Sequence, residues 1–209
     1  MLDAYSFDID RENSLQTYEK IKSIFSRILN RLGIEFTINS ADSDKIGGSV
    51  SEEFVARFDN STIEIAHIFY LGTIYSESGD LYIQLSTGER VPVHMGCYGT
   101  SLTRLIPVLI YQNTTSSGLI WSAVITPFDV EIIQAIPDEE IVNKSRNLED
   151  FLQKRGYRVL LDDRDEKYGV KIKDAEMLGA PYFIIVGKKY HRGYIELRDR
   201  RNNQVLYVP

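Results

Sequence analysis

The order of the expected strands and helices changes near residue 118, and this change limits the possible folds more than any other feature. In residues 1–118, one long amphipathic segment is followed by several strand-like segments with no long helix between them. In residues 119–209, strand-like and helical segments alternate. Consecutive strands favour an antiparallel sheet, whereas strand–helix–strand units favour a parallel sheet with helices on its faces. We therefore expect an α+β unit followed by an α/β unit.

Apolar side chains set the expected elements of the first part. They recur in steps of three and four over residues 14–32, which predicts a helix that ends at Gly33. Strands are expected at 34–39, 53–58, 63–70, 80–85 and 90–95, with a hairpin turn at Thr87 and Gly88. A second helix should run from about residue 101 to 112. Because Pro107 lies inside it, we expect a late start or a kink.

The second part is predicted to contain strands at 129–136, 158–163 and 182–187, with helices at 138–155 and 168–178. A hairpin around Asn202 and Asn203 should close it. The polar, uncharged segment 112–118 separates the parts, so we expect domains at 1–118 and 119–209. Ligands of parallel sheets usually meet the carboxyl ends of the strands, which draws attention to residues 162–164 and 188–189.

Composition excludes several classes of protein. The chain has a single cysteine, Cys97, which excludes an internal disulfide framework and a cysteine-built zinc site. Its three histidines lie far apart and lack the spacing of metal ligands, so no metal site is expected. No apolar run approaches the roughly 18 residues of a membrane helix, and the acidic first ten residues lack a secretory signal pattern. The net charge of −6 lies in the first part, while residues 187–202 are locally basic. That basic stretch indicates either a polyanion partner or a solvated charged rim.

Residues 94–104, HMGCYGTSLTR, combine features of a ligand site. Gly96 and Gly99 remove side chains where a strand is expected to turn into a helix, so a planar ligand can approach the backbone there. Arg104 follows about one helical turn later, and its guanidinium can stack on an aromatic ring. The segment therefore predicts one wall of a nucleotide-sized site.

Several segments, in the same order along the chain, resemble the bacterial and organellar prolyl-tRNA synthetases, a class II aminoacyl-tRNA synthetase family. The matching stretches are MLDAYSFDID (1–10), ADSDKIGGSVSEEF (41–54), AHIFYLGTIYS (66–76), MGCYGTSLTR (95–104), ITPFDVEII (125–133) and GVKIKDAEMLGAPYFIIVG (169–187). The resemblance implies a partial class II catalytic domain with an antiparallel sheet, followed by a three-layer α/β anticodon-binding domain. It also implies a proline–tRNA ligase that activates proline with ATP and Mg²⁺ and transfers it to tRNA.

The resemblance assigns roles to individual positions. MGCYGTSLTR resembles motif 3, which gives Arg104 the adenine-stacking role and places Gly99 and Ser101 beside ATP. The resemblance further implies a proline pocket whose residues are Asp3, Tyr5, His67, Phe69, Thr73 and Cys97. Within it, Asp3 would hold the substrate ammonium and Tyr5 would pack on the pyrrolidine ring. In the second domain, the implied anticodon contacts are Asp163, Arg164, Lys171 and Asp174.

Structural alternatives remain for these residues. Arg104 could be an ordinary surface side chain, and Cys97 could serve as a small apolar core residue. His67, in an apolar strand, could be a hydrogen-bonded core histidine. Residues 162–164 could form a salt bridge at a strand end.

The sequence also departs from the family pattern. Serine occupies position 101, where the family carries glycine, and Glu52 replaces the histidine of the family's Ser-His-Glu-Phe sequence. We expect motif 1 and most of motif 2 to precede residue 1. Only about ten residues separate Phe54 from Ile65, so the family's long editing insertion is not expected there.

Two functional hypotheses follow. The first is a proline–tRNA ligase, incomplete as given, with tRNA(Pro), proline and ATP as partners, a homodimeric full-length form and no membrane association. Its expected compartment is the cytoplasm or the mitochondrial matrix. The alternative is a non-catalytic synthetase-like paralogue that binds tRNA or a partner protein.

Overall fold

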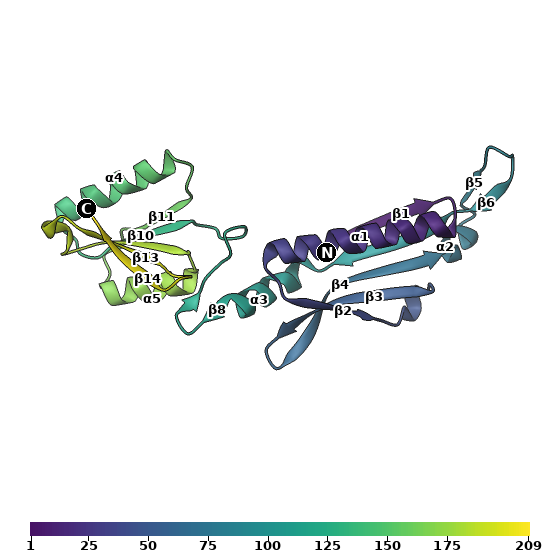
Figure 1. The fold of residues 1–209 in the computed structure, drawn as a ribbon, viewed down its shortest axis with the longest axis horizontal. Coiled ribbons are helices and arrows are strands. Elements are labelled where there is room, and N and C mark those ends of the chain that lie inside the picture. The colour runs from purple at the N-terminus through teal and green to yellow at the C-terminus, as the bar shows by residue number, and fades with distance from the viewer. The chain divides into compact units, whose positions relative to one another are not determined.

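The computed structural model describes residues 1–209, except for the side chain of Asp44. The chain divides into two compact units, Met1–Gln112 and Asn113–Pro209 (Figure 1). The expected division into functional domains after residue 118 stays a prediction. Within the described residues, no helix has the length and apolar character needed to cross a membrane.

A five-stranded sheet forms the first unit. Its strand order is β1 (Leu2–Asp8), β7 (His94–Thr100), β4 (Ser61–Gly72), β3 (Val50–Phe58) and β2 (Phe36–Ser40). Every neighbouring pair is antiparallel, which confirms the expected sheet type. Strands β3 and β4 follow one another through a tight turn in which Asp59 has φ 55°, so no insertion separates them.

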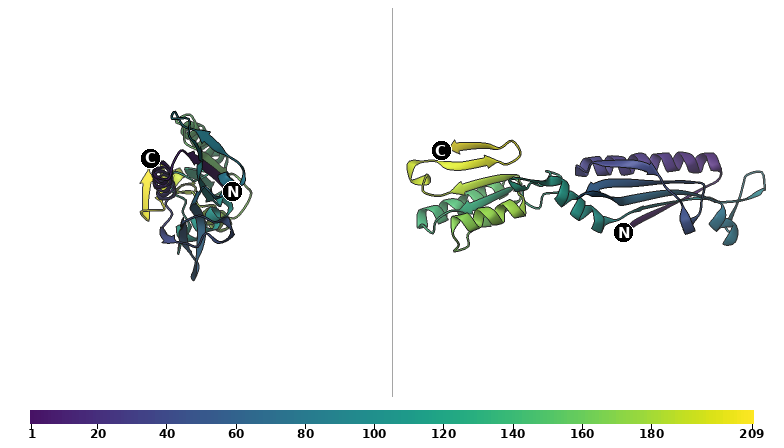
Figure 2. Two further views of the ribbon diagram at one scale, coloured as in Figure 1. Left: turned by 90° about the vertical axis from the view of Figure 1, so that its right-hand side faces the viewer. Right: turned by 90° about the horizontal axis from the view of Figure 1, so that it is seen from below.

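Helix α1 (Arg11–Leu32) covers one face of this sheet (Figure 2). Asp10 caps its first turn by accepting a hydrogen bond from the Asn13 backbone, and Gly33 ends it in the left-handed conformation at φ 79°. Tyr18 packs against Tyr98 of β7, with ring centroids 6.3 Å apart. The predicted helix is confirmed. It packs on one face of the sheet and leaves the opposite face uncovered.

Strand β7 corrects the expectation for residues 94–100. The sequence predicts a strand-to-helix turn there, but His94–Thr100 form an inner strand paired on both sides. A Cβ on Gly96 would overlap the Tyr98 hydroxyl and lie 2.8 Å from Ser6 Oγ. Gly96 therefore makes room for buried neighbours within the sheet and does not form a turn.

The remaining elements of the first unit are short, apart from one helix. Strands β5 (Tyr82–Gln84) and β6 (Arg90–Pro92) form the expected hairpin, with Gly88 at φ 87°. Helix α2 (Ile74–Ser78) follows β4, and the short helix η1 (Asp44–Ile46) precedes β3. A late start or a kink was expected from Pro107, and because helix α3 (Leu102–Asn113) begins directly after β7, the late start is wrong. Pro107 lies in the second turn, and the helix continues past it.

A second five-stranded sheet forms the other unit. Strands β10 (Val130–Gln134), β11 (Val159–Asp162) and β12 (Tyr182–Val186) are parallel. Strands β13 (Ile195–Asp199) and β14 (Gln204–Val208) complete the sheet as an antiparallel hairpin. The strand order is β11-β10-β12-β13-β14. A short helix, η2 (Tyr190–Arg192), precedes β13.

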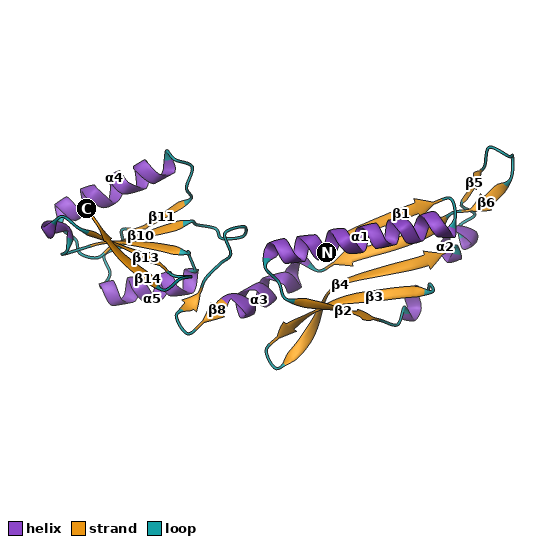
Figure 3. Ribbon diagram, viewed as in Figure 1, coloured by secondary structure: helices purple, strands orange, loops and turns teal.

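Helices α4 (Glu139–Gln153) and α5 (Tyr168–Leu178) lie on opposite faces of this sheet, as Figure 3 shows. Ile141 of α4 packs with Ile132 and Val186, whereas Ala175 of α5 packs with Ile133 and Phe183. Alternate residues along each strand thus pack into two separate hydrophobic cores, one on each face of the sheet. This arrangement confirms the three-layer α/β architecture.

The segment expected as a polar connection has structure of its own. Strands β8 (Thr114–Thr115) and β9 (Gly118–Leu119) form a small hairpin that belongs to the second unit. Gly118 has φ 92°, and a Cβ there would clash with the backbone of Glu176 in α5. The Trp121 indole donates to the carbonyl of Leu178 at 2.9 Å. Close contact with α5 explains why a charge-free sequence is ordered here.

Candidate functional site

Strand pairing brings the predicted pocket residues of the first unit together on one face. Asp3 and His67 both lie opposite Gly99, and Tyr5 and Phe69 both lie opposite Cys97. Because side chains alternate along a strand, all of these positions face away from Tyr98 and helix α1. The sheet thus presents one row of candidate residues on the face that α1 leaves uncovered.

A cavity of about 250 Å³ lies on this face. Of the residues predicted for a proline pocket, Asp3, His67, Phe69 and Cys97 line it. The three residues predicted to border ATP also line it: Gly99, Ser101 and Arg104. Two groups that are distant in the sequence therefore share one cavity.

Tyr5 and Thr73 lie outside the lining. Tyr5 is 59% exposed, and its contact with Cys97 raises the pKa of the Tyr5 phenol. Burial raises the pKa of the Cys97 thiol. Thr73 precedes α2, where its hydroxyl donates to Glu77 Oε1 at 2.7 Å. Tyr5 thus borders the cavity through Cys97, whereas Thr73 is engaged by its own helix.

Arg104 is held in place while half of its side chain stays exposed. Its Nη1 donates to the Glu64 carbonyl at 3.0 Å and lies 3.7 Å from Glu64 Oε2. Its side chain is 47% exposed. A guanidinium fixed along one edge keeps its planar faces free for stacking. No motif in the sequence indicates Glu64 as a partner of Arg104.

Two further residues orient the imidazole of His67. Glu64 Oε1 lies 3.2 Å from Nδ1, and Ser51 Oγ lies 2.7 Å from Nε2. An ionised carboxylate only accepts, so Nδ1 donates to Glu64; when Nε2 carries no proton, it accepts from the Ser51 hydroxyl. The ring also stacks on Phe69, with centroids 3.9 Å apart. Ser51 and Glu64 could have been found from the strand register, but not from sequence alone.

Glu52 faces the other side of the sheet. It accepts hydrogen bonds from the Tyr18 hydroxyl at 2.8 Å and from Lys22 Nζ at 2.7 Å. Burial, with a further contribution from Glu52, raises the pKa of Tyr18. The replacement of histidine by Glu52 therefore fastens α1 to the sheet and does not alter the cavity lining.

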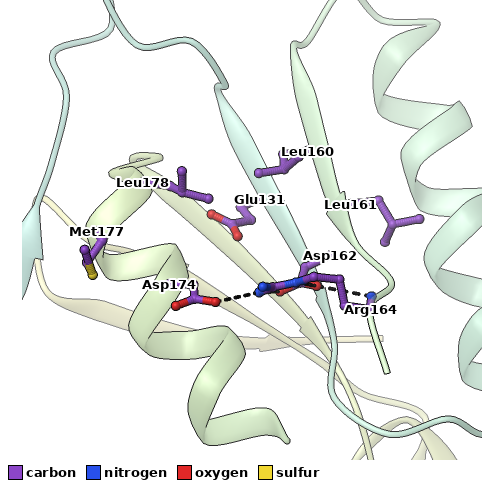
Figure 4. Close-up of a pocket in the computed structure, with 8 residues that line it drawn as sticks. All are labelled: Glu131, Leu160, Leu161, Asp162, Arg164, Asp174, Met177 and Leu178. Atoms are coloured by element: carbon purple, nitrogen blue, oxygen red, sulfur yellow. Dashed lines mark hydrogen bonds and ion pairs between the residues drawn. The ribbon is translucent and has the colours of Figure 1, made fainter. Parts of the chain in front are cut away.

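In the second unit, Arg164 forms the salt bridge that the sequence left open. Its Nε and Nη2 donate to the two oxygens of Asp162 at 2.9 and 2.8 Å (Figure 4). Nη2 also donates to Asp174 at 2.8 Å. The guanidinium hydrogen bonds lower the pKa of Asp162. The planar guanidinium is thus fixed between two carboxylates, with half of its side chain exposed.

Lys171 does not occupy the position expected of an RNA contact. The residue is 1% exposed, and its ammonium donates to the carbonyls of Gln134 and Asp162 at 2.8 and 3.1 Å. Burying an ammonium is costly unless it is hydrogen-bonded, and these backbone carbonyls at the sheet edge supply the acceptors. Asp163, in contrast, is exposed next to this edge. Among the described side chains, no three His, Cys, Asp or Glu gather as a metal site.

A basic and aromatic cluster lies at the carboxyl ends of β10 and β12. Lys189 donates to Glu196 at 3.1 Å and to the Tyr207 hydroxyl at 2.6 Å. Arg198 donates to Glu196 at 2.7 Å and to the Tyr168 hydroxyl at 3.1 Å. A cavity of about 440 Å³, lined in part by Tyr168, Lys189 and Glu196, adjoins it. The sequence did not indicate Tyr168 and Tyr207 as neighbours because they lie far apart along the chain.

The chain is similar to known proteins in both units. The sequence profile described as "tRNA synthetase class II core domain (G, H, P, S and T)" matches residues 1–113, and the one described as "Anticodon binding domain" matches residues 122–209. The proline–tRNA ligase of Listeria innocua is 42% identical over 147 residues, which cover 70% of this chain and 26% of that protein. The proline–tRNA ligase of Rhizobium leguminosarum is 30% identical over 266 residues, covering 96% of this chain and 60% of that protein.

A solved structure shares the fold. Prolyl-tRNA synthetase from Cryptosporidium parvum, complexed with L-proline and AMP, matches with a TM-score of 0.87 and 21% identity. The match covers 99% of this chain and 46% of that one. The chain thus spans less than two thirds of the length of each of these relatives.

Proposed function

Because this chain belongs to the class II tRNA synthetases, with a core domain over residues 1–113 and an anticodon-binding domain over residues 122–209, we propose that it forms part of a proline–tRNA ligase. One observation carries the proposal. Residues assigned separately to proline and to ATP line one cavity on the uncovered sheet face. We propose proline as the amino acid because the similar proteins are named proline–tRNA ligases.

The proline side of the cavity combines a charge with flat apolar surfaces. Asp3 provides the carboxylate that pairs with the substrate ammonium. A Cβ at position 99 would lie 3.1 Å from Asp3 Oδ1. Because Gly99 has no side chain, the space next to the Asp3 carboxylate stays open. The stacked rings of His67 and Phe69 pack on the pyrrolidine, and Cys97 closes the same wall.

The nucleotide side depends on Arg104. Its guanidinium stacks on the adenine of ATP, an interaction worth about 0.5–2 kcal/mol. ATP enters with Mg²⁺, as substrate of the class II reaction. The proline carboxylate attacks the α-phosphorus, pyrophosphate leaves, and the activated prolyl group passes to the tRNA 3′ end. This chain contributes by positioning the two substrates and excluding water from one wall.

The second unit recognises the tRNA anticodon. Unstacked bases are read by polar, basic and aromatic side chains. Asp163, Arg164 and Asp174 are candidates at one sheet edge, and the cluster around Lys189 and Arg198 is a second candidate surface. Lys171 supports the first edge from inside. The full-length ligase acts as a homodimer.

The alternative function is a non-catalytic, synthetase-like protein that binds tRNA or a partner. One observation favours it, since Ser101 lines the cavity where the family carries glycine. Its backbone N–H donates to the Ile65 carbonyl at 3.0 Å, so the serine is firmly placed beside the nucleotide position. A side chain there would weaken ATP binding and leave the anticodon-binding unit functional.

Proline-dependent ATP–pyrophosphate exchange by the complete gene product tests the ligase function. The proposal predicts exchange with proline and none with alanine or glycine. If exchange is undetectable, the alternative is tested by titrating the chain with proline tRNA and a control tRNA. Equal, weak, salt-sensitive binding to both would contradict specific recognition.

A further inference from the structure

Ser51 lies next to the cavity of the first unit without lining it. On β3 it pairs with Phe69 of β4, so it shares the uncovered sheet face with His67 and Phe69. The residue is 8% exposed, and its Oγ lies 2.7 Å from His67 Nε2. Because His67 lines the cavity and Ser51 does not, Ser51 can act on a bound ligand only through the imidazole.

The hydroxyl of Ser51 can serve the imidazole in each of its protonation states. It donates to Nε2 when that nitrogen carries no proton, and it accepts from Nε2 when a proton is present. On the other side of the ring, Nδ1 donates to Glu64 Oε1 at 3.2 Å. Both ring nitrogens therefore have a partner within the protein, whichever form the ring takes.

These two partners also fix the orientation of the ring. A half-turn about the bond between Cβ and Cγ would exchange Nδ1 with Cδ2 and Nε2 with Cε1, so both hydrogen bonds would be lost. One face of the ring stacks on Phe69, with the two planes 18° apart and the centroids 3.9 Å apart. The imidazole thus presents carbon atoms and a π face to the cavity, and no free donor or acceptor.

We propose that Ser51 is a positioning residue that sets amino-acid specificity. By occupying Nε2, it keeps the His67 and Phe69 side of the cavity free of hydrogen-bonding groups, which selects an unsubstituted pyrrolidine over a ring-hydroxylated proline. This inference rests on the proposed proline-activating function. A hydroxyl placed against these rings loses its hydrogen bonds to water and gains none from the protein. An apolar surface rejects an added hydroxyl by about 100-fold, and that is the discrimination expected here.

A purely structural role for Ser51 makes a different prediction. A buried hydroxyl needs a partner, and in that role the bond to His67 only satisfies the serine. Ser51→Ala would then change the stability of the first unit and leave the choice between amino acids unaltered. Selectivity, and not stability, therefore decides between the two roles.

The test is ATP–pyrophosphate exchange by the complete gene product with L-proline, trans-4-hydroxy-L-proline and trans-4-fluoro-L-proline. The fluorinated compound matches the hydroxylated one in position and configuration but lacks its hydrogen-bond donor. In the wild type, kcat/KM for proline should exceed that for hydroxyproline by about 100-fold and that for fluoroproline by less than about ten-fold. The difference between the two analogues separates hydrogen bonding from size.

In Ser51→Ala the imidazole loses its Nε2 partner and can turn, so a ring nitrogen becomes available to the hydroxyl of the analogue. Selectivity for proline over hydroxyproline should fall from about 100-fold to about ten-fold, while selectivity over fluoroproline stays within about two-fold of wild type. Ser51→Thr keeps the hydroxyl on a residue that favours strands and should restore the discrimination. Ser40→Ala, at an exposed position of β2, is the control and should match wild type.

Nitrogen-15 shifts of the His67 ring report the cause, since the Nε2 signal should move in S51A and return in S51T. Unchanged selectivity in an S51A protein that exchanges with proline would overturn the inference and leave the proposed function standing. Wild-type discrimination against hydroxyproline no greater than that against fluoroproline would also overturn it, whether or not S51A folds. Absence of proline-dependent exchange in the wild type would instead overturn the proposed function, and the inference with it.

Discussion

Glu64 Oε1 lies 3.2 Å from His67 Nδ1, and this contact fixes which imidazole nitrogen carries the proton. The same glutamate holds Arg104 through its carbonyl. One residue thus positions a side chain on the proposed proline side of the cavity and another on its proposed nucleotide side. Neither contact was visible in the sequence, because Glu64 belongs to no motif that suggested a role.

Replacing Glu64 with glutamine tests this link. An amide can donate as well as accept, so the His67 tautomer is no longer fixed. Loss of one charge-assisted hydrogen bond, about 1.5–3 kcal/mol, should raise KM for proline by roughly ten-fold or more in the complete gene product. Glu89→Gln, on the exposed β5–β6 hairpin, is the matched control. Nitrogen-15 chemical shifts of the His67 ring report the tautomer, and an unchanged Nδ1–H form in E64Q would contradict the account.

Arg104→Lys separates stacking from charge. Lysine keeps the charge but loses the planar guanidinium, so KM for ATP should rise about three- to thirty-fold. KM for proline should change less, because Arg104 borders only the nucleotide side. Arg57→Lys, at an exposed position of β3, serves as the control in the same steady-state assay. A larger effect on proline than on ATP would contradict the adenine role.

Gly96→Ala tests the packing reason for the first glycine of β7. The added Cβ would overlap the Tyr98 hydroxyl, so the first unit should lose about 1–3 kcal/mol of unfolding free energy. Gly169→Ala is the control, since nothing lies within 4 Å of a Cβ there and the position is helical. Urea unfolding followed through NMR signals of each unit measures both. Equal stability of G96A and wild type would show that the strand shifts to accommodate the added methyl group, which would contradict the packing role of Gly96.

Lys171→Met tests whether the buried lysine is structural. The variant leaves two carbonyls and Asp162 without their ammonium, which should cost about 3–5 kcal/mol of stability in the second unit. Lys173 lies two residues further along α5 at an exposed position, so Lys173→Met should cost little stability. Thermal unfolding measures the loss. Affinity of the folded variant for proline tRNA should stay close to that of K173M, and a selective loss of tRNA binding without destabilisation would restore Lys171 as an RNA contact.

The pH dependence of stability follows from Glu131. Its folded pKa, about 7, lies above that of an unfolded glutamate, so the neutral form is favoured by folding. Stability is therefore highest below about pH 4.5 as far as this group is concerned, and roughly 3 kcal/mol is lost as the pH rises to 7. Glu131→Gln should stabilise the second unit more at pH 8 than at pH 5, as urea unfolding at both pH values would show. An equal gain at both would contradict a buried, titrating carboxyl.

The sequence was sufficient for features that depend on local periodicity. Spacing of apolar residues located α1, and alternation of strands with helices identified the three-layer unit. It failed where tertiary contacts decide the conformation. Gly96, which suggested a turn in 94–100, instead makes room for Tyr98, and the charge-free segment at 112–118 is ordered by contact with α5.

The same division holds for the candidate sites. Motif resemblance gathered residues that the sheet register then placed on one face, because alternate positions on paired strands share a side. It could not show that Lys171 is buried or that Glu52 points at α1, since both depend on which face a helix covers. Ser51 and Glu64 were missed because their contacts with His67 and Arg104 follow from how the strands pair.

Proline-dependent ATP–pyrophosphate exchange by the complete gene product, compared between wild type and Asp3→Asn, tests the central claim most directly. The account predicts exchange that requires proline, and a KM for proline raised at least ten-fold in D3N with KM for ATP nearly unchanged, because the ammonium loses its carboxylate. Proline-independent exchange, or a D3N variant with an unaltered KM for proline, would contradict it.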